Sequence, residues 1–216
     1  MELHHRRLSS AQQLSRAAAF AALVDRAQAC RDCPRMEGRR RVLGPANGPQ
    51  SARLIVVGTA PGRLGAERTG IPFSGDRSGA GLDALLVRAG LQRDQVFITN
   101  AVLCNPQDRR GRNATPSASE LRRCRRHLAG TLALVDAPVV VTLGATALAA
   151  VAAVGGERLR FPDCLGAARR WSVQGLPERL LVATYHCGPR VTAHPARRAA
   201  LLAQWDVVAA ATRCTA

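Results

Sequence analysis

The chain has 216 residues, of which 47% are hydrophobic and 21% charged, so it is long enough for one domain and too apolar for an intrinsically disordered chain. All 31 basic residues are arginines, and they face 15 acidic residues, which gives a formal net charge of +16. A GC-rich genome explains the absence of lysine but not this charge. The charge indicates a polyanionic partner, and the planar guanidinium of arginine suits phosphate groups.

The N-terminal residues, MELHHRRLSSAQQLSR, lack the apolar core of a secretory signal peptide, so we expect a cytoplasmic protein. In a reducing compartment its seven cysteines are expected to be metal ligands or buried thiols rather than disulfides. Residues 137–155 carry no charge, which is long enough for a membrane helix. However, Pro138, a β-branched run and Gly144 divide this stretch into a strand and an Ala-rich helix, so we expect no membrane partner.

In chain order, the pattern predicts a helix over residues 10–29, which the segment 30–34 ends. Four short apolar runs follow, at residues 54–57, 96–102, 139–143 and 180–185. Such continuous runs are typical of strands covered on both faces of a parallel sheet. Helical patterns alternate with them at residues 81–90, from a capping box at Ser117 onwards, at 144–154 and at 194–211. The alternation predicts a three-layer α/β/α sandwich with a central, mostly parallel sheet.

We expect three parts along the chain: an N-terminal helical segment (1–29), the α/β domain (30–211) and a frayed tail (212–216). In sheets of this kind, ligands bind at the carboxyl ends of the strands. The loops after Val57, Ile98, Leu143 and Thr184 are therefore the first places to look for a site.

The cysteines form one pattern that suggests a metal centre. Cys30 and Cys33 have the C-x2-C spacing that lets two thiolates reach one centre, and Cys104 and Cys124 are well placed to complete a set of four. Four thiolates bind either a [4Fe–4S] cluster or a zinc ion, and the spacing alone leaves both open. The other three cysteines are expected to be buried core residues: Cys164, Cys187 and Cys214.

Polar and aromatic residues gather after the predicted strands. The segment Gly-Thr-Ala-Pro-Gly (58–62) allows close backbone approach to a ligand. Phe73 lies among glycines and charged residues. It is expected either to stack on a planar ligand or to anchor the loop. Asn100 needs hydrogen-bond partners, from a ligand or from neighbouring backbone. His186 ends the last strand and would face the same edge, although a lone histidine is usually structural.

Taken in order, these motifs resemble the iron–sulfur uracil-DNA glycosylases of families four and five. The resemblance runs from about Cys30 to Trp205. Its motifs are Cys30-x2-Cys33-Pro34, Gly58–Gly62, Thr69-Gly-x-Pro-Phe73-x-Gly, Thr99-Asn100-Ala-Val-x-Cys104, Pro116-x3-Glu120-x3-Cys124 and Tyr185-His186. It implies that the four cysteines of the pattern above hold a [4Fe–4S] cluster, which would act as a structural clamp.

The chain departs from both families. Thr59 stands where family four usually has glutamate, and Gly62 resembles family four where family five usually has alanine. Cys187 and Gly188 follow the motif histidine where family five usually has Val-Ser. The chain therefore resembles an intermediate that is nearer to family five, and its range of bases stays open.

The resemblance implies an enzyme that flips uracil, or another deaminated base, out of DNA and hydrolyses its N-glycosidic bond. It implies that Asp76, the acid of the segment Phe-Ser-Gly-Asp-Arg-Ser-Gly (73–79), stabilises the sugar or orients a water molecule. It also implies that His186 stabilises the departing base. The residues implied to bind the base are Gly58, Thr59, Ala60, Phe73, Asn100 and His186.

Arginines in or beside the strand-end loops are expected to contact DNA phosphates, and we expect the protein to act as a monomer. The arginines predicted to bind DNA are Arg63, Arg77, Arg112 and Arg190. Arg109 and Arg110 lie in the same loops and could also contact phosphates. Two other classes remain open. One is a zinc-bearing nucleic-acid-binding module without enzyme activity. The other is a nucleotide-binding α/β enzyme, which ranks lowest because the chain has neither a G-x-G-x-x-G motif nor a Walker lysine.

Overall fold

The computed structural model describes residues 9–215. Its centre is a five-stranded sheet in the order β2-β1-β3-β5-β4, in which only β4 runs antiparallel to its neighbour. The strands are β1 (Leu54–Gly58), β2 (Val96–Asn100), β3 (Val139–Leu143), β4 (Ala168–Trp171) and β5 (Arg179–Thr184). Every residue of β1, β2 and β3 is buried, which explains why these strands appear in the sequence as unbroken apolar runs.

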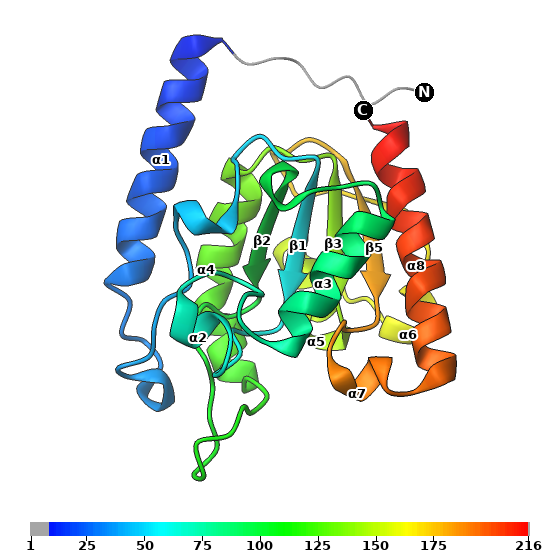
Figure 1. Cartoon of the computed structure of the whole chain (residues 1–216). Helices are drawn as coiled ribbons and strands as arrows, with labels where there is room; N and C mark the ends of the chain where they lie inside the picture. Colours follow the sequence, from blue (N-terminus) through cyan, green and yellow to red (C-terminus); the bar gives the residue numbers. More distant parts are fainter. Residues whose placement is uncertain (1–8, 216) are drawn as a thin grey trace.

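Helices cover both faces of the sheet and confirm the three-layer α/β/α arrangement (Figure 1). One face carries α1 (Ser10–Gln28), α4 (Ala118–Leu134) and α5 (Ala145–Val154), and the other carries α3 (Arg77–Arg88) and α8 (Pro195–Cys214). Successive residues of β1 alternate between the two cores, with Ile55 in the first and Val56 in the second. The remaining elements are short: α2 (Ala66–Thr69), α6 (Phe161–Cys164), α7 (Pro189–Thr192), η1 (Pro34–Met36), η2 (Pro45–Asn47) and η3 (Arg93–Gln95).

Capping residues fix where two helices begin. The expected capping box opens α4, because Ser117 accepts a hydrogen bond from the Glu120 amide and Glu120 accepts one from the Ser117 amide. Helix α3 begins at Arg77, one turn before the expected start at residue 81. The reason is Asp76, whose Oδ1 accepts from the Gly79 amide at 2.9 Å and so caps the helix.

Helix α1 is part of the same core as the sheet. Phe20, Leu23 and Ala27 are buried in it, and the Phe20 ring meets Phe97 of β2 edge to face at 5.8 Å. At the other end of the chain, α8 continues to Cys214, past the point where we expected a frayed tail. Residues 1–8 of the expected N-terminal segment, and residue 216, lie outside the described residues.

The three cysteines expected in the core differ in burial. Cys187 is buried as expected, and Cys164 is partly buried against the core. Cys214 is exposed, so the expectation of a buried thiol was wrong there: the last turn of α8 buries Ala211 and Thr212, whereas Arg213 and Cys214 face solvent. Within residues 9–215, no helix combines the length and the hydropathy needed to cross a membrane.

Candidate active site

A cavity of about 490 Å³ opens at the carboxyl ends of the parallel strands. Four segments build its wall: the loop after β1, the start of α3, the segment after β2, and the loop after β5. The structure brings together six of the residues singled out from the sequence: Thr59, Ala60, Phe73, Asp76, Asn100 and His186. It adds polar lining residues that the sequence reasoning missed, namely Ser78, Asn105, Asn113 and Thr115.

Gly58, which we expected to bind the base, is not a lining residue of the cavity but lies next to two residues that are, Phe73 and Asn100. A Cβ atom at this position would be 2.5 Å from Asn100 Oδ1 and 2.7 Å from two atoms of the Phe73 ring. The missing side chain is therefore what allows the ring and the amide to lie together at the end of β1.

Phe73 combines the two roles that the sequence left open, since it packs in the second core and lines the cavity. Its φ of +49° is the only positive value at a non-glycine residue among the described residues. The Arg93 guanidinium donates to its carbonyl, which helps to hold this uncommon backbone conformation. The ring centroid lies 6.0 Å from that of His186, with 34° between the ring planes.

Asn100 presents a buried amide with unused hydrogen-bonding capacity. The residue is 1% exposed, and neither its Nδ2 nor its Oδ1 has a hydrogen-bond partner in the described chain. Leaving such groups unpaired costs about 1–3 kcal/mol, so a ligand with a matching donor and acceptor would gain by pairing with them.

The hydrogen bonding of His186 defines its tautomer. Nδ1 accepts from the Gly188 amide at 2.9 Å, so the ring proton is on Nε2. Burial lowers the pKa of His186, although the negative charge of Asp76 acts in the opposite direction. His186 is therefore a neutral imidazole that offers one N–H donor beside the cavity.

The two oxygens of Asp76 have different surroundings. Oδ1 caps α3, whereas Oδ2 lies against the backbone of residues 62–65. A Cβ atom would be 2.7 Å from Oδ2 at Gly62 and 2.4 Å at Gly65, so both glycines make room for the carboxylate. The cap fixes the side chain, and the carboxylate lines the cavity.

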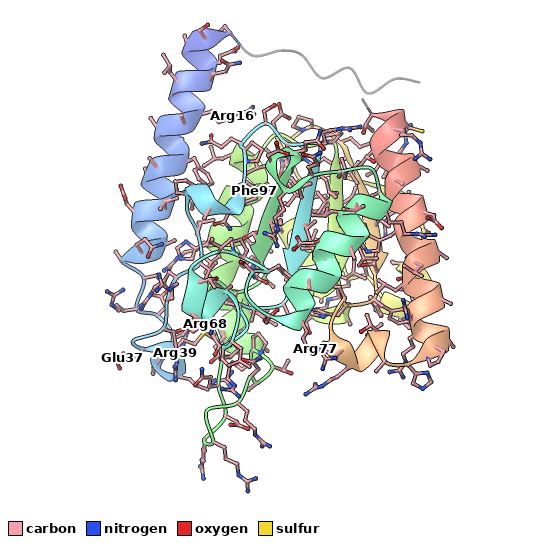
Figure 2. The ribbon with its side chains drawn as sticks, viewed as in Figure 1. Arg16, Glu37, Arg39, Arg68, Arg77 and Phe97 are labelled. Atoms are coloured by element: carbon pink, nitrogen blue, oxygen red, sulfur yellow. The ribbon has the colours of Figure 1, made fainter. Side chains whose placement is uncertain are left out.

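The arginines chosen from the sequence occupy different places. Arg190 lines the cavity, while Arg63 and Arg77 are exposed on neighbouring segments. Arg112 forms an ion pair with Asp108 at 2.9 Å. Figure 2 shows Arg77 and Arg68 towards the end of the molecule where the strands end, with Arg16 towards the opposite end.

The four cysteines of the expected metal centre line a second, small cavity of about 30 Å³. Burial, with smaller contributions from the nearby Cys30 and Cys33, raises the pKa of Cys104 to about 11 and that of Cys124 to about 12. Arg126 donates to Cys30 Sγ at 3.6 Å. Residues 9–215 contain no group of three or more His, Cys, Asp or Glu side chains that could hold a metal ion. The four thiols are therefore not placed to hold a metal ion directly, but they line one cavity, and their number matches the one thiolate per iron that a [4Fe–4S] cluster takes.

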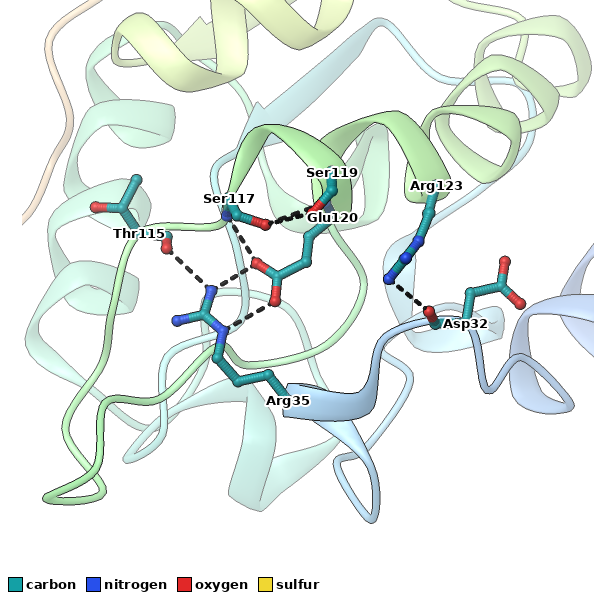
Figure 3. Close-up of polar contacts among 7 residues, drawn as sticks. All are labelled: Asp32, Arg35, Thr115, Ser117, Ser119, Glu120 and Arg123. Carbon is teal, nitrogen blue, oxygen red and sulfur yellow. Dashed lines mark hydrogen bonds and ion pairs between the residues drawn. The ribbon is translucent and has the colours of Figure 1, made fainter.

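An ion pair fixes the C-x2-C segment against the start of α4 (Figure 3). Arg35 donates to both carboxylate oxygens of the buried Glu120, at 2.9 and 2.5 Å, and to the Thr115 carbonyl at 3.2 Å. Arg123 of α4 donates to the Asp32 carbonyl at 2.9 Å. These contacts join the N-terminal cysteine pair to the helix that carries Cys124.

Comparison with known proteins agrees with this fold. Residues 45–208 match the model of the uracil-DNA glycosylase superfamily, so the chain belongs to this superfamily. Relatives of two types are similar to it. They include a type-4 uracil-DNA glycosylase of Thermotoga maritima, 32% identical over 75% of this chain and 78% of the relative. A type-5 uracil-DNA glycosylase of Thermus thermophilus is 36% identical over 63% of this chain and 74% of the relative. These findings confirm the resemblance seen in the sequence motifs.

Proposed function

We propose that this chain is a DNA repair glycosylase that removes uracil from DNA by hydrolysing the N-glycosidic bond, which leaves an abasic site. The main observation that supports this function is the side-chain amide of Asn100, which has no hydrogen-bond partner among the described residues and lies beside the Phe73 ring. Uracil O4 would accept from Nδ2, and the uracil N3–H would donate to Oδ1. Cytosine has the opposite polarity at both positions and would leave the buried amide unpaired, which disfavours it strongly.

A base inside a duplex cannot reach this cavity, so the nucleotide must swing out. Stacking on Phe73 offsets about 1–3 kcal/mol of that unfavourable step. The remaining penalty is smallest for weakly paired bases, so uracil opposite guanine is the favoured substrate.

In the reaction, the bond between the sugar C1′ and the base N1 breaks, and its electron pair leaves with the base. The neutral His186 donates a hydrogen bond from Nε2 to a base oxygen where negative charge develops. The carboxylate of Asp76 stabilises the positive charge on the sugar or orients the water. The water oxygen then bonds to C1′ and releases its proton to solvent.

We infer that Cys30, Cys33, Cys104 and Cys124 hold a [4Fe–4S] cluster. When bound, the cluster would supply a covalent link between the N-terminal segment and α4 rather than reaction chemistry. The thiols that line one cavity support this inference, as does the similarity to type-4 and type-5 relatives. A purified protein that is brown and contains iron is expected. A colourless protein holding one zinc ion would instead favour a non-enzymatic nucleic-acid-binding module.

The decisive test uses oligonucleotide duplexes that carry one uracil, followed by alkali to cleave abasic sites. We expect strand cleavage with the wild-type protein. Asn100→Asp and Asp76→Asn are each expected to slow release by about 100-fold or more while DNA affinity stays within a few fold. No cleavage by the wild-type protein would overturn the proposal. Parallel duplexes with hypoxanthine or mismatched thymine define the range of bases.

A further inference from the structure

Residues 106–114 form a hairpin at the mouth of the cavity, and the loop that carries it extends beyond the ends of the strands (Figure 1). Gln107 and Asn113 pair across its base in an antiparallel bridge. The turn is closed by hydrogen bonds from the Asp108 amide to the Arg112 carbonyl, at 2.9 Å, and from the Gly111 amide to the Asp108 carbonyl, at 3.0 Å. The hairpin is therefore ordered although its tip is exposed.

The charged side chains of the tip form two groups: an ion pair that shapes the turn, and two arginines outside it. Asp108 Oδ1 accepts from the Arg110 and Arg112 amides, and Oδ2 accepts from the Arg112 side chain, all at 2.9 Å. These bonds lower the pKa of Asp108, so its carboxylate is charged and neutralises Arg112. Arg109 and Arg110 are exposed, and no ion pair within residues 9–215 involves them. The hairpin thus presents two uncompensated guanidinium groups.

The base of the hairpin is joined to the wall of the cavity by side-chain amides. Asn113 Oδ1 accepts from the Arg63 amide at 2.9 Å and from Asn105 Nδ2 at 3.0 Å. Asn105 is 1% exposed and also donates to the Pro61 carbonyl at 2.6 Å. The hairpin and the loop after β1 are therefore held in one fixed relation.

We propose that this hairpin grips the duplex beside the extruded nucleotide, with Arg109 and Arg110 on backbone phosphates and Asp108 holding the turn in its binding shape. The proposal rests on the proposed function, because DNA is the partner that it names. Two free cations on a preordered turn at the cavity mouth suit a polyanion, and preordering reduces the entropy lost on binding. Arg112, also expected from the sequence to bind DNA, forms the ion pair with Asp108 that helps to shape the turn.

The test compares binding of the wild-type protein and of the Arg109→Ala/Arg110→Ala double variant to a duplex without uracil, over a range of salt concentrations. Each lost phosphate contact reduces the slope of log affinity against log salt by about 0.9, so the double variant should lose about 1.8. Arg213→Ala, an exposed position in the last turn of α8, is the matched control and should leave the slope unchanged. A double variant with wild-type slope and affinity would overturn the proposal.

A second variant tests the ordering of the turn. Asp108→Ala/Arg112→Ala keeps the net charge and both free arginines but removes the side-chain hydrogen bonds that shape the tip, so we expect affinity to fall by about 2- to 10-fold with little change in slope. Unchanged affinity would show that the turn needs no preordering and would count against the proposal. Uracil release by the wild-type protein is measured separately. If release is absent, the proposed function fails. If release is present and the slopes do not differ, only the hairpin proposal fails.

Discussion

At the end of β1, Gly58 lies beneath the Phe73 ring and the Asn100 amide. In Gly58→Ala, the new methyl group must displace both, and small displacements of reacting groups reduce rates strongly. We expect uracil release to slow by about 10-fold or more, measured in single-turnover assays. Gly44→Ala is the matched control, because a Cβ atom there meets nothing within 4 Å. Equal rates for the two variants would contradict this account of the cavity floor.

His186 leads to a prediction about pH. Because burial lowers its pKa, the imidazole stays neutral as the pH falls through the ordinary histidine value of about 6.5. The fall in rate that reflects His186 protonation should therefore lie below pH 6.5, and His186→Asn should remove that part of the profile. The unfolded chain binds the proton more readily, so His186 stabilises the fold above pH 6.5 and this contribution is lost as the pH falls below it. A rate that halves near pH 6.5 or above would contradict the prediction.

Among the individual residues of the site, those at the ends of the strands were predictable from the sequence. Asn100 is the last residue of β2, and His186 follows β5. The carboxyl ends of these parallel strands share one edge of the sheet, and both residues line the cavity. Asn105 and Asn113 were missed because their contacts depend on the path of a loop, which hydrophobic periodicity does not encode. The cap formed by Asp76 was not predicted, because the motif containing this residue implied only that its carboxylate stabilises the sugar or orients a water molecule.

Among the elements, α1 is expected to contribute to the stability of the whole domain. Phe20 is 6% exposed and meets Phe97 of the sheet, so Phe20→Ala should lower the free energy of unfolding by about 3–5 kcal/mol. Leu14→Ala lies on the same helix at a side chain that is 74% exposed, and it should change stability by less than about 0.5 kcal/mol. Urea unfolding of the wild-type protein and both variants measures these changes in the free energy of unfolding. Similar values would show that α1 is only loosely attached.

The strands differed in how well they could be predicted. Those buried on both faces were recognised from continuous apolar runs. The structure places β2 and β3 within those runs, and β1 extends one residue past its run, to Gly58. The edge strand β4 was missed. Its sequence, Ala-Arg-Arg-Trp, contains two arginines that form ion pairs with Glu157 and Glu178, so it has no apolar run to detect.

For the whole molecule, the formal charge of +16 predicts DNA binding that weakens steeply with salt. The contacts proposed for Phe73 and Asn100 with the base are uncharged, so they should add affinity without altering the salt dependence. We expect duplexes with and without uracil to give equal slopes of log affinity against log salt, measured with the inactive Asp76→Asn variant. A flat dependence on salt would show that the arginines do not provide the affinity.

The cavity takes its wall from residues as far apart in the chain as Thr59 and Val191. A nascent polypeptide that has not yet reached β5 contains the aromatic ring and the amide but lacks the imidazole and the loop that follows it. A chain that stops before β5 is therefore expected to have an incomplete cavity and no release of uracil.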